Sequence, residues 1–159
     1  MTSDPGARPE ALIVWTDLCE VVDQVRIRVN RDLLESAGLT LAENLVLCQV
    51  AMSPEQRLRM IDLAGQLVLA KSAITKTVDR LEGRGLLRRE RDPGDRRTVH
   101  AVLTPEGGRD FDMARTAYLD SVERHFAQHL DKTVLRRLRG LPGRVLRTPA
   151  PQRHTSRSG

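Results

Sequence analysis

A run of hydroxyl-bearing, small and basic residues in the middle of the chain has side chains suited to contacting an anion. It holds Lys71, Ser72, Ala73, Thr75, Lys76, Thr77 and Arg80. Hydrogen-bond donors beside small groups can reach base edges and phosphates in a DNA groove without steric conflict. The same polar run could also be an ordinary solvated face, so its meaning depends on the element that carries it.

That element is predicted to be a helix over 72–84. Ile74, Val78 and Leu81 recur at helical spacing, which predicts that they form a buried stripe and turn the polar run outward. Ser72 is the predicted N-cap, which would direct the positive end of the helix toward a phosphate. Asp79 and Glu82 are expected to pair with neighbouring basic residues, and the helix is expected to end at Gly83-Arg84-Gly85 with a left-handed glycine.

A second basic group, Asp95-Arg96-Arg97, lies beside a strong turn signal, Asp92-Pro93-Gly94-Asp95. The turn separates two short, partly β-branched runs, 86–91 and 98–103, which are predicted to form a β-hairpin. Two guanidinium groups at its tip would suit the negative potential of a DNA minor groove, and Asp95 would orient one of them. Solvated arginines on a loop are the alternative.

The other predicted helices span 10–37, 41–52, 60–67, 105–129 and 132–139, with N-caps at Thr40, Thr104 and Asp131. Two helices, 60–67 and 72–84, joined by a tight turn and followed by a hairpin predict a winged helix-turn-helix. The fold class is therefore mainly α with a small β-hairpin wing. Residues 1–9 are predicted to be disordered, and 141–159 to be a basic flexible tail.

Composition narrows the classes of function. The 159 residues carry a formal charge of +5 and the pI is near 10.0, which suits a polyanionic partner. The few aromatic residues argue against stacking of single-stranded bases. No apolar run reaches membrane-spanning length and no signal pattern opens the chain, so a cytoplasmic location is expected. No catalytic constellation or phosphate loop is visible, so neither an enzyme nor a cofactor is expected.

The central motif resembles the MarR (multiple antibiotic resistance regulator) family of bacterial transcriptional regulators. The resemblance rests on Leu63-Ala64, on Lys71-Ser72-Ala73-Ile74-Thr75-Lys76-Thr77-Val78-Asp79-Arg80-Leu81-Glu82-Gly83-Arg84-Gly85-Leu86-Leu87, on Asp95-Arg96-Arg97 and on Leu103-Thr104-Pro105-Glu106-Gly107. It is close over 58–107 and looser over the flanking helices. Val68 departs from it, where a small or turn-favouring residue is expected.

The resemblance implies a homodimer on a pseudo-palindromic duplex site. Helices 10–37 and 105–140 would interlock with those of a second copy, and 38–104 would form the DNA-binding lobe. Ser72, Ala73, Thr75, Lys76 and Arg80 would serve the major groove, and Arg97 the minor groove. The family resemblance favours a ligand-responsive repressor; an activator, or a DNA coat without sequence specificity, remains open.

The resemblance also implies a small, often aromatic, anionic effector. Trp15, Arg59 and Asp62 are the candidate pocket residues, although Trp15 could instead be a residue of the dimer core. Cys19 and Cys48 are expected to be free thiols among apolar neighbours; Cys19 is a weak candidate for a redox switch because no basic residue adjoins it. His125 and His129 lie one helical turn apart and could share a metal, but such a pair is a weak signal and no metal is expected.

Overall fold

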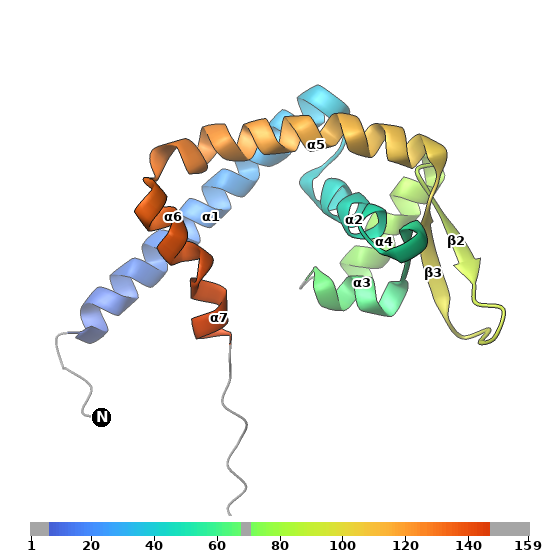
Figure 1. Ribbon diagram of the computed structural model, residues 1–159, viewed down its shortest axis with the longest axis horizontal. Coiled ribbons are helices and arrows are strands. Elements are labelled where there is room, and N and C mark those ends of the chain that lie inside the picture. The colour runs from blue at the N-terminus through green and yellow to red at the C-terminus, as the bar shows by residue number, and fades with distance from the viewer. Residues whose placement is uncertain (1–6, 68–70, 147–159) are drawn as a thin grey trace, which may run out of the picture.

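The computed structural model describes residues 7–67 and 71–146. Its elements, in chain order, are α1 (Ala7–Ala37), α2 (Leu41–Ala51), the 3-10 turn η1 (Pro54–Gln56), β1 (Arg57–Arg59), α3 (Met60–Gln66), α4 (Lys71–Gly83), β2 (Leu87–Arg91), β3 (Val99–Leu103), α5 (Pro105–His125), the 3-10 turn η2 (Ala127–His129), α6 (Lys132–Arg139) and α7 (Leu141–Val145). The predicted fold class is confirmed: mostly helix, with a small antiparallel sheet forming the wing (Figure 1).

Three of the predicted helix starts are capped as the sequence indicates. Thr40 accepts a hydrogen bond from the backbone N–H of Glu43, and the Glu43 carboxylate accepts one from the backbone N–H of Thr40, which completes a capping box. Thr104 caps α5 with Pro105 in its first turn, and Asp131 caps α6. The prediction for Ser72 is wrong, because α4 already includes Lys71 and Ser72 lies inside the helix.

The sheet has one strand more than the hairpin predicted from the sequence. Its order is β1-β3-β2, with both neighbouring pairs antiparallel; Leu87 pairs with Leu103 and Arg57 with Val102. The short strand β1 follows a turn in which Glu55 and Gln56 both have positive φ. A three-residue strand carries too little alternation to be recognised from its sequence.

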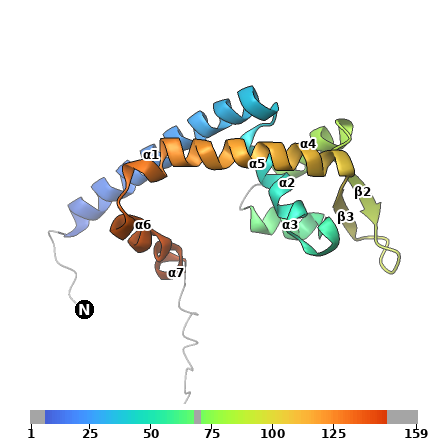
Figure 2. The same cartoon turned by 45° about the horizontal axis from the view of Figure 1, so that its top comes forward.

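The hydrophobic core joins the lobe to the two long helices. Leu47 of α2, Leu63 of α3, Leu81 of α4 and Ala114 of α5 are all fully buried within one cluster. Figures 1 and 2 show α1 and α5 crossing side by side, with the lobe of α2, α3, α4 and the sheet at one end. The N-terminal part of α1 extends away from that lobe.

The ends of the predicted elements need three corrections. Helix α1 begins at Ala7, so 7–9 are helical where disorder was predicted; Pro9 is tolerated because it lies in the first turn. Helix α5 ends at His125, and 127–129 form a 3-10 turn. The segment 141–145, expected to be flexible tail, is the short helix α7. The remainder of that predicted tail lies outside the described residues, as do 1–6.

Candidate nucleic-acid interface

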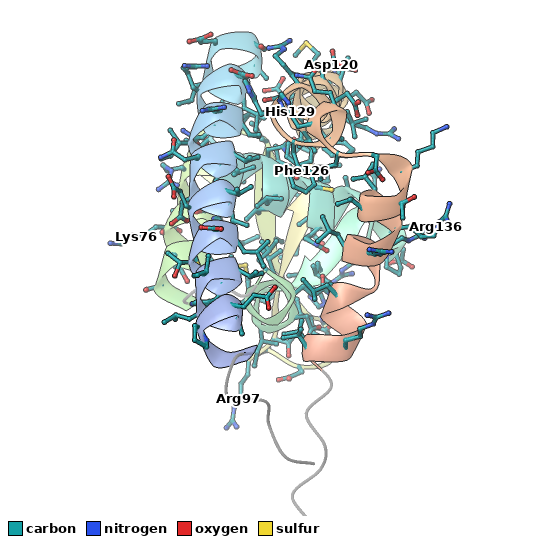
Figure 3. The ribbon with its side chains drawn as sticks, turned by 90° about the vertical axis from the view of Figure 1, so that its left-hand side faces the viewer. Lys76, Arg97, Asp120, Phe126, His129 and Arg136 are labelled. Carbon is teal, nitrogen blue, oxygen red and sulfur yellow. The ribbon has the colours of Figure 1, made fainter. Side chains whose placement is uncertain are left out.

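Helix α4 presents a polar face beside a buried stripe, as its spacing predicts. Ile74, Val78 and Leu81 are at most 1% exposed. Among the predicted groove-facing residues, the exposed ones are Ser72, Ala73, Thr75, Lys76 and Arg80. Figure 3 shows Lys76 pointing away from the body of the molecule. Lys71 begins the helix, and its side chain lies outside the described residues.

Thr77 does not belong to the exposed face. It is 4% exposed, and its hydroxyl donates to the backbone carbonyl of Ala73 at 2.9 Å. The same hydroxyl accepts a hydrogen bond from Arg80 at 3.3 Å. The buried stripe is therefore wider than the three apolar residues indicate, and Thr77 supports the helix instead of facing a ligand.

Arg80 is fixed in place by a buried carboxylate of helix α2. Its Nε donates to Oε1 of Glu43 at 3.1 Å, and the backbone N–H of Thr40 donates to Oε2 of Glu43 at 2.8 Å. Burial alone would raise the pKa of Glu43, but the hydrogen bonds from Thr40 and Arg80 hold that pKa below its usual value. The Arg80 side chain is still 53% exposed, so it is braced at one edge and open at the other.

A second brace joins α4 to the wing. Arg89 of β2 contacts Asp79 at 2.7 Å and forms a short ion pair with Glu82, whose carboxylate also accepts the backbone N–H of Arg89 at 3.0 Å. Burial opposes the charge on Arg89, but these two carboxylates raise its pKa above the usual value. The acidic residues of α4 do pair with arginine, although the partner lies on a strand and not on the helix itself.

The wing tip is shaped by two aspartates. Asp92 accepts the backbone N–H groups of Gly94 and Asp95, and the first of these bonds in particular lowers its pKa. Asp95 accepts the backbone N–H of Arg97 at 3.0 Å and the Thr98 hydroxyl at 2.8 Å. The expectation that Asp95 orients a guanidinium is therefore corrected: it orders the loop backbone.

The two arginines of the tip are free to project. Arg96 and Arg97 are both exposed, and Figure 3 shows Arg97 at the lower extremity of the molecule. Between this tip, the start of α3 and α4 lies a groove of about 450 Å³, lined by Arg59, Met60, Ile61, Thr75, Arg89, Arg97, Thr98 and Val99. The helix face and the wing thus flank one concave surface that carries basic and hydroxyl groups.

The three candidate effector residues do not meet within one chain. Trp15 lies in the N-terminal half of α1 and is 65% exposed, against a cavity it shares with Leu141 and Val145. Arg59 and Asp62 lie in the lobe, where they pair with each other at 2.9 Å. No local sequence pattern relates these positions, and the length of α1 separates Trp15 from the other two.

A different cavity, between α2 and α5, combines the features expected of a small-molecule site. It measures about 290 Å³ and is lined by Asn44, Cys48, Met52, Phe111, Arg115, Tyr118 and Leu119. Asn44 is 3% exposed, and its amide oxygen has no hydrogen-bond partner among the described residues. Burial raises the pKa of the Cys48 thiol, which keeps it in the neutral form. The signal that sequence reasoning missed is the i, i+4, i+7 spacing of Phe111, Arg115 and Tyr118 on one helix face.

The two histidines have separate partners. His125 Nε2 lies 2.8 Å from Asp32, and Ser121 donates to the same carboxylate oxygen at 2.8 Å. The hydrogen bond from Ser121, the largest influence, and the contact with His125 together lower the pKa of Asp32 despite its burial. His129 is exposed and lies near the carbonyl of Arg124. Within 7–67 and 71–146, no group of three or more potential ligands could hold a metal ion.

Both cysteines are free, as expected, and half-buried. Within the described residues, no helix is both long enough and apolar enough to cross a membrane.

The chain is similar to known transcriptional regulators in both sequence and structure. The model of the MarR family matches residues 39–99. The structure of Sco3205, a MarR family transcriptional regulator from Streptomyces coelicolor in complex with DNA, is 28% identical, with a TM-score of 0.82, over 89% of this chain and 91% of that one. AbsC, a MarR family transcriptional regulator from the same organism, is 30% identical, with a TM-score of 0.78, over 85% of this chain and 90% of that one.

A further solved structure contains a small molecule. CouR from Rhodococcus jostii RHA1, bound to p-coumaroyl-CoA, is 30% identical, with a TM-score of 0.74, over 86% of this chain and 94% of that one. Among curated proteins, the HTH-type transcriptional regulator YkoM of Bacillus subtilis is 35% identical over 69 residues. That match spans 43% of this chain and 45% of YkoM, so it covers less than half of the relative.

Proposed function

Because the chain belongs to the MarR family of transcriptional regulators, we propose that it binds a pseudo-palindromic duplex operator as a homodimer and acts as a ligand-responsive repressor of transcription. The observation that carries this proposal is the double brace on α4, by Glu43 on one side and Arg89 on the other, next to an exposed basic wing. A recognition helix must keep a fixed angle to the wing if both are to enter neighbouring grooves. Since its target is the chromosome, the proposed location is the cytoplasm.

The proposed contacts follow the exposed side chains. Lys71, Ser72, Ala73, Thr75, Lys76 and Arg80 would serve the major groove, and Arg96 and Arg97 the minor groove or its phosphates. Asp95 would act through the loop backbone, and Thr77 through the packing of α4. The proposed DNA-binding lobe is 38–104, between the helices that we assign to dimerisation, 10–37 and 105–140.

The apolar surface of α1 supports the dimer. The exposed side chains there are Leu12, Ile13, Val14, Trp15, Val21, Val22 and Ile27, each at least 45% exposed, and Leu141, Val145 and Leu146 lie at the other end of the chain. A run of this size on a protein with a formal charge of +5 is typical of an interface that a partner covers. In a dimer on B-DNA the two α4 helices would lie about 34 Å apart, one turn of the duplex.

The experiment is selection of duplexes from a randomised pool, followed by anisotropy titration of the selected duplex and a scrambled one. We expect Arg97→Ala and Lys76→Ala each to weaken binding to the selected duplex by about 1 to 3 kcal/mol, the scale of a groove contact. Arg109→Ala is the matched control, because Arg109 is an exposed arginine on α5 paired with Glu106.

Three results would contradict the proposal. Equal affinity for the selected and scrambled duplexes would indicate a DNA coat without sequence specificity. Absence of binding at low salt would exclude DNA as the partner. A monomer at micromolar concentration in sedimentation would exclude the dimer.

For the effector, we propose the cavity between α2 and α5 in place of the set of Trp15, Arg59 and Asp62. A buried amide oxygen without a partner favours a ligand that donates a hydrogen bond, and Arg115 at the rim offers a cation to a carboxylate. Phe111 and Tyr118 add aromatic walls, so the expected ligand class is a small aromatic acid with a hydroxyl group. The p-coumaroyl-CoA bound by CouR supports an aromatic acyl ligand in a relative.

The probes for this site are salicylate, 4-hydroxybenzoate and p-coumarate in a thermal-shift titration. A ligand that binds the folded state raises the melting temperature by mass action. We expect at least one probe to do so for the native chain, and Arg115→Gln to abolish the shift while Arg109→Gln retains it. No shift with any probe, or a full shift in the Arg115→Gln variant, would refute this assignment.

A further inference from the structure

The positive charge of this chain is concentrated at one end. Of its 26 basic and 21 acidic residues, eight basic and no acidic residues lie in 132–159. The preceding 131 residues, which include the whole DNA-binding lobe, therefore carry a formal charge of −3. The lobe itself, 38–104, holds 11 basic and eight acidic residues and carries +3, whereas 1–37 and 105–131 carry −3 each. The segment 132–159 is therefore the second net-positive part of the chain, and it adds to the long-range attraction toward a polyanion.

The described part of that segment is the α6–α7 arm, which we define as residues 132–146. Its basic residues are Lys132, Arg136, Arg137, Arg139 and Arg144, and all five are exposed. None of the five forms an ion pair with another described residue, whereas Arg59, Arg80, Arg84 and Arg89 of the lobe all do. The arm thus resembles the wing tip, where Arg96 and Arg97 are also exposed and form no ion pair with a described residue, and differs from these four paired arginines of the lobe.

Packing turns the cations of the arm outward. In α6, the apolar side chains Val134, Leu135 and Leu138 are half-buried, and Arg136 projects away from the molecule (Figure 3). Cations near the C-terminus of a helix are favoured by its dipole, which accounts for Arg137 and Arg139. It does not account for Lys132 in the first turn of α6, where a cation is disfavoured.

The arm also extends from α5 in the same general direction as the wing. In Figures 1 and 2, α6, α7 and the strands β2 and β3 all lie on one side of α5. If the wing enters a groove as proposed, a surface on this side of α5 would be turned toward the duplex.

We infer that the basic residues of the α6–α7 arm, as distinct from its apolar residues, which we assign to the dimer, form a second DNA-binding surface that contacts duplex phosphates without reading sequence; this rests on the proposed function. Arginine is suited to phosphate because its planar guanidinium donates two parallel hydrogen bonds. The arm has no aromatic residue on which single-stranded bases could stack. Because the lobe is proposed to bind duplex DNA, we propose duplex DNA as the partner of the arm as well.

The test measures how the affinity for the selected duplex depends on salt. Each phosphate contact contributes about 0.9 to the slope of log affinity against log salt. We expect a variant with Arg136→Gln, Arg137→Gln, Arg139→Gln and Arg144→Gln to lose about 2 to 4 from the magnitude of this slope. Its preference for the selected over the scrambled duplex should be unchanged, because phosphate contacts carry no sequence information. The matched control replaces the same four arginines by Lys, which keeps the charge and should retain the slope.

The outcomes separate the two proposals. If the native chain binds no duplex, the proposed function fails. If the native chain binds but the Gln variant keeps the native slope, only the inference about the arm is overturned. A monomeric Gln variant in sedimentation, or an equal loss of slope in the Lys variant, would show that these arginines hold the dimer or its packing, which also overturns the inference.

Discussion

The tightest backbone approach in the lobe lies where α5 begins, and it predicts opposite effects for two neighbouring glycines. A Cβ atom added to Gly107 would lie 2.0 Å from the carbonyl oxygen of Leu86 and 3.0 Å from Cδ1 of Leu103. A Cβ added to Gly108 would have Cδ2 of Leu103 at 4.0 Å as its nearest neighbour. Both residues lie in the first turns of α5, so their intrinsic helix propensities are matched and only the surroundings differ.

Relief of the contact at Gly107 requires the start of α5 to move away from Leu86 by about 1 Å. That movement would break bonds that dock the helix: the Thr104 hydroxyl donates to the Gly85 carbonyl at 2.7 Å, and the backbone N–H of Thr104 donates to the Leu86 carbonyl at 3.2 Å. Overpacking costs about 1 to 3 kcal/mol, and each lost hydrogen bond about 1 kcal/mol. The better helix propensity of alanine offsets about 0.5 to 1 kcal/mol of this loss of stability.

We therefore expect Gly107→Ala to lower the free energy of unfolding by about 2 to 4 kcal/mol, and Gly108→Ala to raise it by about 0.5 to 1 kcal/mol. The assay is urea unfolding followed by circular dichroism at one fixed protein concentration, because the stability of a dimer depends on concentration. A Gly107→Ala variant within about 0.5 kcal/mol of the native chain would refute the close approach on which the reasoning rests.

Two further predictions concern the braces on α4. Because the pKa of Glu43 is lowered in the folded state, its charge stabilises the fold above its ordinary pKa of 4.5, and this contribution is lost as the pH falls through the lowered value. Glu43→Gln should thus have a lower free energy of unfolding than the native chain at pH 7, measured by urea unfolding. The difference between the two should be smaller at pH 3. An equal difference at both pH values would contradict the ion pair with Arg80. Arg89→Met should cost about 1 kcal/mol of stability, since Asp79 and Glu82 are partly exposed, and should weaken DNA binding by tilting the wing. Arg88→Met is its control and should do neither, because within 7–67 and 71–146 the exposed Arg88 forms an ion pair only with Glu90 of the same strand.

Much of the fold is local and could be predicted from the sequence. Thr104-Pro105 and Asp131 determine where α5 and α6 begin, because each cap satisfies N–H groups within three residues of itself. The turn after α4 was predicted for the same reason: Gly85 has a φ of 74°, which residues with a side chain rarely adopt. Signals of this kind act over one helical turn and need no knowledge of the tertiary structure.

The braces and the effector cavity depend on contacts that the sequence does not bring together. Glu43 and Arg80 are 37 residues apart, and no local pattern links them. The width of the buried stripe on α4 is set by α2 and the sheet, and this is why Thr77 was placed on the wrong face. The cavity needs Asn44 from α2 and Arg115 from α5, and only the packing of those two helices brings them to one place.

The braces also constrain how an effector could release DNA. Helix α4 is tied to α2 through Glu43 and Arg80, to the wing through Arg89, and to the turn before α2 through Arg84, which donates to the Gly38 carbonyl at 2.9 Å. A shift of α4 alone would break all of these contacts, two of them on half-buried or buried charges. A ligand between α2 and α5 instead touches the junction of the lobe with the long helices, where it can move the lobe as one body. Control of DNA affinity should therefore arise from the spacing of two rigid lobes in the dimer, and not from rearrangement of the surface that reads the bases.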